Sequence, residues 1–405
     1  MFPDFRLTAI ILKPNKNRVN KWGLIAKHFF IAILAIGCIE PYQAPDIGEN
    51  ISITVVDGFI NATDGSATVR LTKAIALSKK EEYPAEKGAE VRISSENGDS
   101  FTLQEQDSGR YNAYGLAVDM STKYQLSIRT SDNRVYISDY ISVMKTPPID
   151  SVTWRAEDEG VTMLVNTHDD TESSRYYYWD YTETWEYRAP WPSYYTNINK
   201  TVVTRKPEDI AQTCYKTEPS TKIIVGSTGR LSEDVVRDFP LTYIQTGTGK
   251  ISVLYSIIVR QRVIDKIEYE FLQDLQRVTE SVGGLFDSQP YEILGNIRSE
   301  DPSIPVLGFF SAGFVEEKRS FVRFTDLPDH LQKWLYHYCE LDTMCSVSAN
   351  LRPDLRCTID IDNMPENSYL VASLAPFFPG YSYTNARCAD CRDQGGVLTK
   401  PDFWP

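Results

Sequence analysis

The sequence has few histidines and no hydrophobic run long enough to cross a membrane. Histidine occurs four times in 405 residues, and neither G-x-S-x-G nor H-E-x-x-H is present. The signatures of nucleophile-elbow hydrolases and of zinc proteases are therefore missing. The apolar run "FFIAILAIG", at 29–37, is short beside the ~20 residues that a spanning helix needs. The sequence gives no candidate catalytic residue, metal site or cofactor.

Basic side chains are also in deficit. Lys and Arg number 42 against 55 Asp and Glu, which gives a formal net charge of −13. Without residues 1–37 the balance is 36 basic and 54 acidic side chains, or a net charge near −18. Binding to nucleic acid requires basic patches that neutralise phosphates, so a nucleic-acid partner is excluded. Electrostatic adhesion to anionic lipid is disfavoured for the same reason.

The N-terminus has the pattern of an export signal. Six basic residues and one acid precede the apolar run, and the small residue Gly37 stands directly before Cys38. This order predicts a secretory signal that resembles a bacterial lipobox, with Ala35 in the place usually taken by Leu. We expect residues 1–37 to be a lipoprotein signal peptide and Cys38 to be lipidated. Residues 38–50 would be a tether, and two or three acyl chains would hold the protein on the membrane. The alternative is a buried helix with a stray cysteine.

Export changes the interpretation of the other cysteines. An even number in an oxidising compartment predicts up to three disulfides, with fifteen connectivities open. The candidates are Cys214, Cys339, Cys345, Cys357, Cys388 and Cys391. The motif "CADC" lacks the second C-x-x-C of a zinc site, and the glycines and proline after it do not fit a thioredoxin-like helix. We therefore expect structural disulfides that tie down the C-terminal segment.

Short alternating segments predict a mainly β protein. Residues 51–146 contain several such segments separated by turns, among them the hairpin signal Asn97-Gly98. This spacing is typical of an Ig-like or fibronectin-like β-sandwich. Pro147-Pro148 marks a plausible boundary, after which residues 147–405 would form a larger mixed β domain.

One prominent amphipathic helix is expected at 265–282. Ile267, Phe271, Leu275, Val278 and Val282 recur at helical spacing, Asp265 is a suitable N-cap, and Gly283-Gly284 would end the helix. A stripe of this kind should pack on a sheet.

Aromatic residues concentrate between Tyr176 and Tyr195. In a strand, alternate residues share one face, and an exposed face of this kind would suit ligand stacking or protein binding. The candidate interaction residues are Tyr177, Trp179, Tyr181, Trp185, Tyr187 and Trp191. The alternative is a packed sheet face with tyrosine hydroxyls at its edge.

Two long motifs resemble a known family. "YSIIVRQRVIDKIEYEFLQDLQRVTESVGGLFDSQPYEILGNI", at 255–297, and "CADCRDQGGVLTKPDFW", at 388–404, are similar to a lipoprotein family of Bacteroidetes known as a domain of unknown function, DUF4249. "VVDGFI" and "PPIDSV" also fit it. The resemblance implies an outer-membrane lipoprotein, periplasmic or surface-exposed, encoded beside TonB-dependent receptors. The family has no established activity, so no catalytic residue carries over.

These observations favour a lipid-anchored accessory or binding protein that acts beside a TonB-dependent outer-membrane transporter in ligand capture or gating. An envelope hydrolase with carboxylates that the sequence does not single out is one alternative. A structural or adhesive surface lipoprotein is another.

Overall fold

Strands make up most of the part of the chain that the structure describes. The computed structural model describes residues 53–74, 84–107, 109–281, 293, 295–333, 339–345, 359–360, 368–373 and 380–405. In these ranges the α-helices are α2 (Lys266–Ser281) and α3 (Ala386–Ala389). The prediction of a mainly β protein is therefore confirmed. The expected signal peptide, tether and lipidated Cys38 lie outside the described residues.

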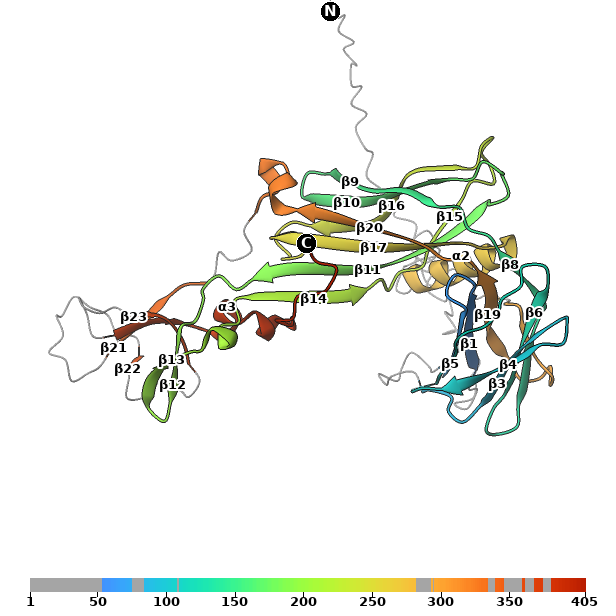
Figure 1. Ribbon diagram of the computed structural model, residues 1–405, viewed down its shortest axis with the longest axis horizontal. Coiled ribbons are helices and arrows are strands. Elements are labelled where there is room, and N and C mark those ends of the chain that lie inside the picture. Colours follow the sequence, from blue (N-terminus) through green and yellow to red (C-terminus); the bar gives the residue numbers. More distant parts are fainter. Residues whose placement is uncertain are drawn as a thin grey trace, which may run out of the picture. The chain divides into compact units, whose positions relative to one another are not determined.

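The first strands form one long sheet together with two strands from much later in the chain. Its order is β18-β7-β6-β3-β4-β5-β2-β1-β19-β8, and β8 also pairs with β6. The eight strands from β6 round to β8 thus form a closed, barrel-like sheet, and Figure 1 shows β19 lying beside β1. The strands are β1 (Thr54–Asn61), β2 (Ser66–Lys73), β3 (Glu90–Ser95), β4 (Ser100–Glu105), β5 (Arg110–Ala113), β6 (Lys123–Arg129), β7 (Val135–Ser138), β8 (Ile141–Met144), β18 (Ile297–Ser299) and β19 (Val306–Gly313).

Strand alternation builds the core of the barrel-like sheet. In β1, Val56 and Ile60 are buried while Asp57 between them is exposed, as expected when successive side chains point to opposite faces. Phe310 of β19 joins the same core and is fully buried. The expected Ig-like or fibronectin-like sandwich for residues 51–146 is not confirmed, because β19 and the β6–β8 pairing close the sheet. A parallel partner from so far along the chain cannot be predicted from local alternation.

Two further sheets share a second hydrophobic core. The order of one is β16-β10-β9, and that of the other is β14-β11-β17-β20 with β15 also on β11. Figure 1 shows β9, β10 and β16 as a layer alongside β20, β17 and β11, and buried residues from both sheets belong to one cluster. The strands are β9 (Ile149–Ala156), β10 (Gly160–His168), β11 (Tyr176–Arg188), β14 (Thr213–Pro219), β15 (Ile224–Ser227), β16 (Val235–Gln245), β17 (Leu254–Val263) and β20 (Glu316–Arg323).

Helix α2 lies where the sequence predicts it, although its buried face differs. The side chain of Asp265 accepts a hydrogen bond from the Glu268 backbone N–H at 2.7 Å, which confirms the predicted N-cap. Phe271 is buried, but Ile267 is 61% exposed. The expected apolar stripe is therefore wrong at Ile267 and at Val278, which is 40% exposed, and the helix buries the carboxylate of Glu268 beside Phe271 instead.

A fourth sheet, of six strands, and several short turns complete the fold. Its order is β13-β12-β23-β24-β21-β22. The strands are β12 (Tyr195–Ile198), β13 (Thr201–Thr204), β21 (Asp342–Cys345), β22 (Ile359–Asp360), β23 (Tyr369–Ser373) and β24 (Gly380–Thr384), and the 3-10 turns are η1 (Pro207–Asp209), η2 (Phe324–Asp326), η3 (Asp329–Leu331) and η5 (Cys391–Gln394). In the described part of the chain, no helix has the length and apolar character that crossing a membrane would require.

Candidate functional site

The aromatic face of β11 is part of the protein core. Tyr177, Trp179, Tyr181, Trp185 and Tyr187 alternate along the strand as predicted, and each is at most 6% exposed. The indole N–H of Trp179 donates to Gln261 Oε1 at 2.8 Å. Because this face packs against the neighbouring sheet, these five residues do not form an exposed stacking platform. The interpretation as a packed sheet face is the correct one.

Trp191, the sixth candidate, supports the C-terminal segment. Its ring is half-buried, and its indole N–H donates to the Cys339 carbonyl at 3.0 Å. The backbone N–H of Trp191 donates to the Cys388 carbonyl at 3.1 Å. Both contacts hold Trp191 beside the disulfide between Cys339 and Cys388, so the role of Trp191 seen here is structural.

Four of the candidate cysteines form two disulfides. Cys214 is joined to Cys391 across 177 residues, and Cys339 to Cys388 across 49 residues. All four residues are buried. The two cysteines of "CADC" therefore bond to different partners and not to each other, which confirms a structural role for the motif. Cys345 lies in β21 without a described side chain, and Cys357 lies outside the described residues.

The residues around the motif show why it folds as two tight turns. The side chains of Asn385 and Asp390 accept hydrogen bonds from the backbone of Cys388 and Arg392 and so cap α3 and η5. A Cβ atom on Gly396 would lie 2.3 Å from the Tyr187 hydroxyl, so only glycine permits this close approach. Further on, Trp404 packs edge-on against Tyr215. The motif therefore holds the C-terminal segment against β14, the edge strand of its sheet.

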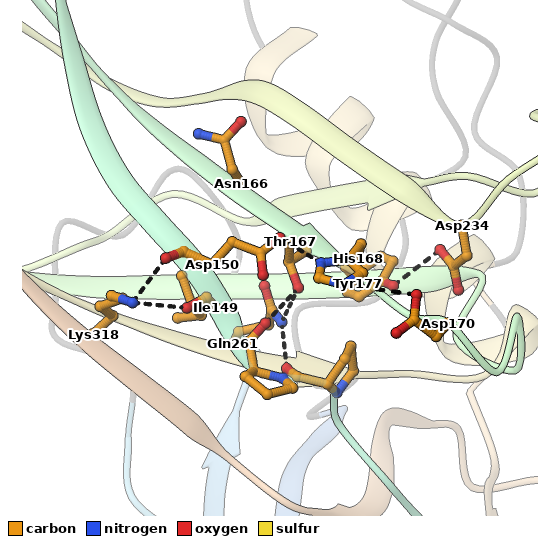
Figure 2. Close-up of polar contacts among 12 residues, drawn as sticks. Ile149, Asp150, Asn166, Thr167, His168, Asp170, Tyr177, Asp234, Gln261 and Lys318 are labelled. Atoms are coloured by element: carbon orange, nitrogen blue, oxygen red, sulfur yellow. Dashed lines mark hydrogen bonds and ion pairs between the residues drawn. The ribbon is translucent and has the colours of Figure 1, made fainter.

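The described residues contain no group of three or more His, Cys, Asp or Glu side chains that could hold a metal ion. Figure 2 shows the histidine–carboxylate pair at the end of β10 instead. His168 Nδ1 lies 2.7 Å from Asp150 Oδ2, and its Nε2 lies 3.8 Å from Asp170 Oδ1. The hydrogen bond to Asp150 raises the pKa of His168. In the described ranges the polar partners of His168 are these two carboxylates, so the contacts bring it no hydroxyl nucleophile.

A buried polar network lies on the core face of β17. Gln261 is fully buried, and its amide donates to the Pro147 carbonyl at 2.9 Å and to Thr167 Oγ1 at 3.0 Å. Figure 2 shows Gln261 and Thr167 pointing toward each other. Every polar atom of the Gln261 amide has a partner, as a buried amide requires. This network attaches the Pro147-Pro148 segment to the sheet.

The opposite face of β11 and β17 carries a cluster of charged residues that lines two cavities. Tyr178 pairs across the strands with Arg262, and Asp180 pairs with Arg260. The Arg262 guanidinium lies between two aromatic rings, 4.4 Å from the Tyr178 centroid and 4.7 Å from the Phe59 centroid. Cation–π contacts of this kind hold a guanidinium firmly in place.

Arg262 connects three parts of the fold. Its Nη1 lies 2.8 Å from Glu268 Oε1 on α2 and 2.9 Å from Ser311 Oγ on β19. Burial raises the pKa of Glu268, while the facing Arg262 works in the other direction. Burial alone would lower the pKa of Arg262, but Glu268 keeps it above its usual value. Burial also raises the pKa of Tyr178, to about 12.

Two cavities adjoin this cluster. One, of about 280 Å³, is bordered by the outward side of β1, by β19 and by apolar residues of α2 that include Phe271 and Leu275. The other, of about 290 Å³, is lined mainly by polar residues of β1, β11, β17 and β20. Asp57, Tyr178 and Arg262 line both. These residues could not be predicted as one site from the sequence because they come from separate elements. The signal that could have indicated them is the second parity of β11, which holds Tyr178 and Asp180.

Comparison with known proteins identifies a family but no activity. A family model described as "Domain of unknown function (DUF4249)" matches residues 39–319, so the "CADC" motif lies beyond the matched region. No curated protein matches. Among the solved structures that match is the adhesin InvE of Yersinia pseudotuberculosis, at 12% identity, with 53% of this chain and 56% of that chain covered and a TM-score of 0.14. This chain therefore spans just over half of that structure's chain, and so low a score supports no inference about fold or function.

Proposed function

The chain belongs to the DUF4249 family, a domain of unknown function, and we propose that it is a lipid-anchored binding protein of the outer membrane. In this proposal it acts beside a TonB-dependent transporter in ligand capture or gating. Cys38 carries the lipid, and the folded part stays close to its partner because both are held at one membrane. Tethering of this kind raises the effective concentration of one partner near the other.

The observation that carries the proposal is the pair of buried disulfides. Structural disulfides form and persist in oxidising compartments such as the cell envelope and are rare in the cytoplasm. Cys214–Cys391 and Cys339–Cys388 therefore favour export, in agreement with the basic and apolar N-terminus that ends at Cys38. Support for the transporter as partner comes from the family resemblance alone.

Ligand capture is supported by the two cavities at Arg262. They combine an apolar side on α2 with charged groups on β11 and β17. Binding sites for small molecules commonly have this composition, with mostly apolar walls and a few fixed polar groups.

Co-purification from solubilised outer membrane tests the proposal. The full-length protein with a C-terminal tag is recovered in mild detergent, beside Cys38→Ala as the matched control. We expect wild type to incorporate radioactive palmitate and to retain a TonB-dependent β-barrel receptor, identified by mass spectrometry. Cys38→Ala should lose the label. Unchanged labelling of Cys38→Ala would refute the anchor, and labelled wild type without any receptor would refute the partnership.

A further inference from the structure

The two cavities at Arg262 differ in the polarity of their linings, and this difference suggests a class of ligand. The first is bordered by apolar side chains of α2 and β19, among them Phe271, Leu275 and Leu307. The second is bordered by charged side chains of β11, β17 and β20, including Glu317. Each volume lies just below the ~300 Å³ at which small-molecule sites begin. Asp57, Tyr178 and Arg262 line both cavities, so the apolar lining and the polar lining lie next to each other.

The positive charges of the site are already matched. Arg262 is held by Glu268 and Ser311 between two aromatic rings. Arg260 Nε donates to Asp180 Oδ1 at 2.6 Å, and its Nη2 donates to Thr182 Oγ1 at 2.9 Å. An incoming anion would have to compete with these carboxylates for each guanidinium.

The negative charges are in excess. Asp57 and Glu317 line the polar cavity, both are exposed, and in the described part of the chain neither has a salt-bridge partner. With Asp180 paired to Arg260 and Glu268 paired to Arg262, these two carboxylates give the site a net negative charge. Asp57 also lines the apolar cavity, so it stands where the two halves meet.

We propose that the two cavities at Arg262 act as one site for a small amphipathic cation, with its ammonium group at Asp57 and its apolar body against α2. The alternation of β1 supports this placement, since Asp57 lies on the strand face that points away from the buried Val56 and Ile60. A charge-assisted hydrogen bond from an ammonium group to this carboxylate fixes the polar end. Burial of the alkyl part beside Phe271 and Leu275 adds the hydrophobic contribution. The inference rests on the ligand-capture part of the proposed function and gives it a ligand class.

Calorimetry with n-hexylammonium chloride tests the site. The full-length protein in detergent is titrated with this probe, and n-hexanol and sodium hexanoate serve as neutral and anionic probes of similar length. Asp57→Asn is compared with Asp107→Asn, which removes one exposed charge at a residue outside both cavities. Every protein meets the same micelles, so uptake of the probe by detergent cancels in the comparison.

We expect wild type and Asp107→Asn to bind hexylammonium alike, and Asp57→Asn to bind it about tenfold more weakly. Glu317→Gln, on the exposed side of β20, should weaken binding by a smaller factor and covers the case in which Asp57→Asn fails to fold. The proposal is overturned if wild type binds no hexylammonium, if hexanol or hexanoate binds as tightly, or if both cavity variants bind like wild type. Such a result would leave the lipid anchor and the transporter untouched, because palmitate labelling and co-purification test those separately.

Discussion

The barrel-like sheet and the pair of sheets after it reach stability by different means. The core of the barrel-like sheet is mostly aliphatic, with Val69, Leu71, Leu126 and Ile128 fully buried, and its buried aromatic members are Tyr111, Tyr124, Tyr136 and Phe310. The paired sheets enclose large aromatic residues and satisfied polar groups such as Gln261, and one of the disulfides closes on them. Local alternation indicates which residues of each strand face the first core, although β19 joins that core from far along the chain. The second core depends on specific hydrogen bonds and a disulfide. Neighbouring side chains should therefore compensate less well for the loss of stability when one of its residues is substituted.

The barrel-like sheet depends on one strand from far along the chain, β19. Removing a core side chain from β19 would measure how much stability this strand contributes. Phe310 is fully buried in the barrel core, so Phe310→Ala should lower the free energy of unfolding by about 3–5 kcal/mol. Equilibrium urea unfolding measures this loss, and hydrogen exchange locates it in β1 and β2. Tyr114→Ala, at a residue that is 74% exposed, is the control and should change stability by less than about 0.5 kcal/mol. Equal loss of protection in β10 and β16 would mean that the two regions unfold as one. The barrel-like sheet and the paired sheets would then not be stabilised independently.

Removing the Cys214–Cys391 disulfide tests how far the paired sheets depend on it. Cys214→Ala/Cys391→Ala opens a link across 177 residues and should cost about 2–5 kcal/mol of stability. We expect hydrogen exchange to rise in β11 and β14 while the barrel-like sheet keeps its protection.

The second disulfide supplies the matched control. Cys339→Ala/Cys388→Ala opens a link across 49 residues, and the chain-entropy model then predicts a loss about 1 kcal/mol smaller. Thermal unfolding of both double variants checks the order. A larger loss for the shorter link would show that local packing, for instance at Trp191, outweighs loop closure.

Local sequence patterns predicted the elements well and their partners poorly. The parity of β11 and the N-cap Asp265 follow from residues close together in the chain, while a structural role for "CADC" follows from its neighbours together with the export signal, and the structure confirms each of the three. The closure of the barrel-like sheet by β19 does not, because the pairing strand is far away in sequence. Disulfide connectivity stayed open for the same reason, since fifteen pairings satisfy the count of cysteines.

The candidate site could not be predicted from the sequence, because its charged residues come from different elements and meet only in the folded structure. Arg262 looks like an ordinary exposed residue of an alternating strand, yet its side chain is only 16% exposed, lies between Phe59 and Tyr178 and forms an ion pair with Glu268. This ion pair also accounts for the wrong apolar stripe. Helix α2 turns Glu268 inward, where burial without Arg262 would be costly, and leaves Ile267 exposed.

The smallest expected effect concerns the surface of the paired sheets, at His168. Its hydrogen bond to Asp150 raises its pKa above the ordinary 6.5, so the NMR titration of the ring should have its midpoint above that value. A pKa raised by folding contributes stability that is fully present below the unfolded-state pKa and is lost as the pH rises through the folded-state pKa. Asp150→Asn should lower the midpoint more than Asp170→Asn does, because Asp150 lies at 2.7 Å and Asp170 at 3.8 Å. An unchanged midpoint in Asp150→Asn would mean that solvent screens the pair completely, and that β9 and β10 are held together by their core side chains and backbone ladder alone.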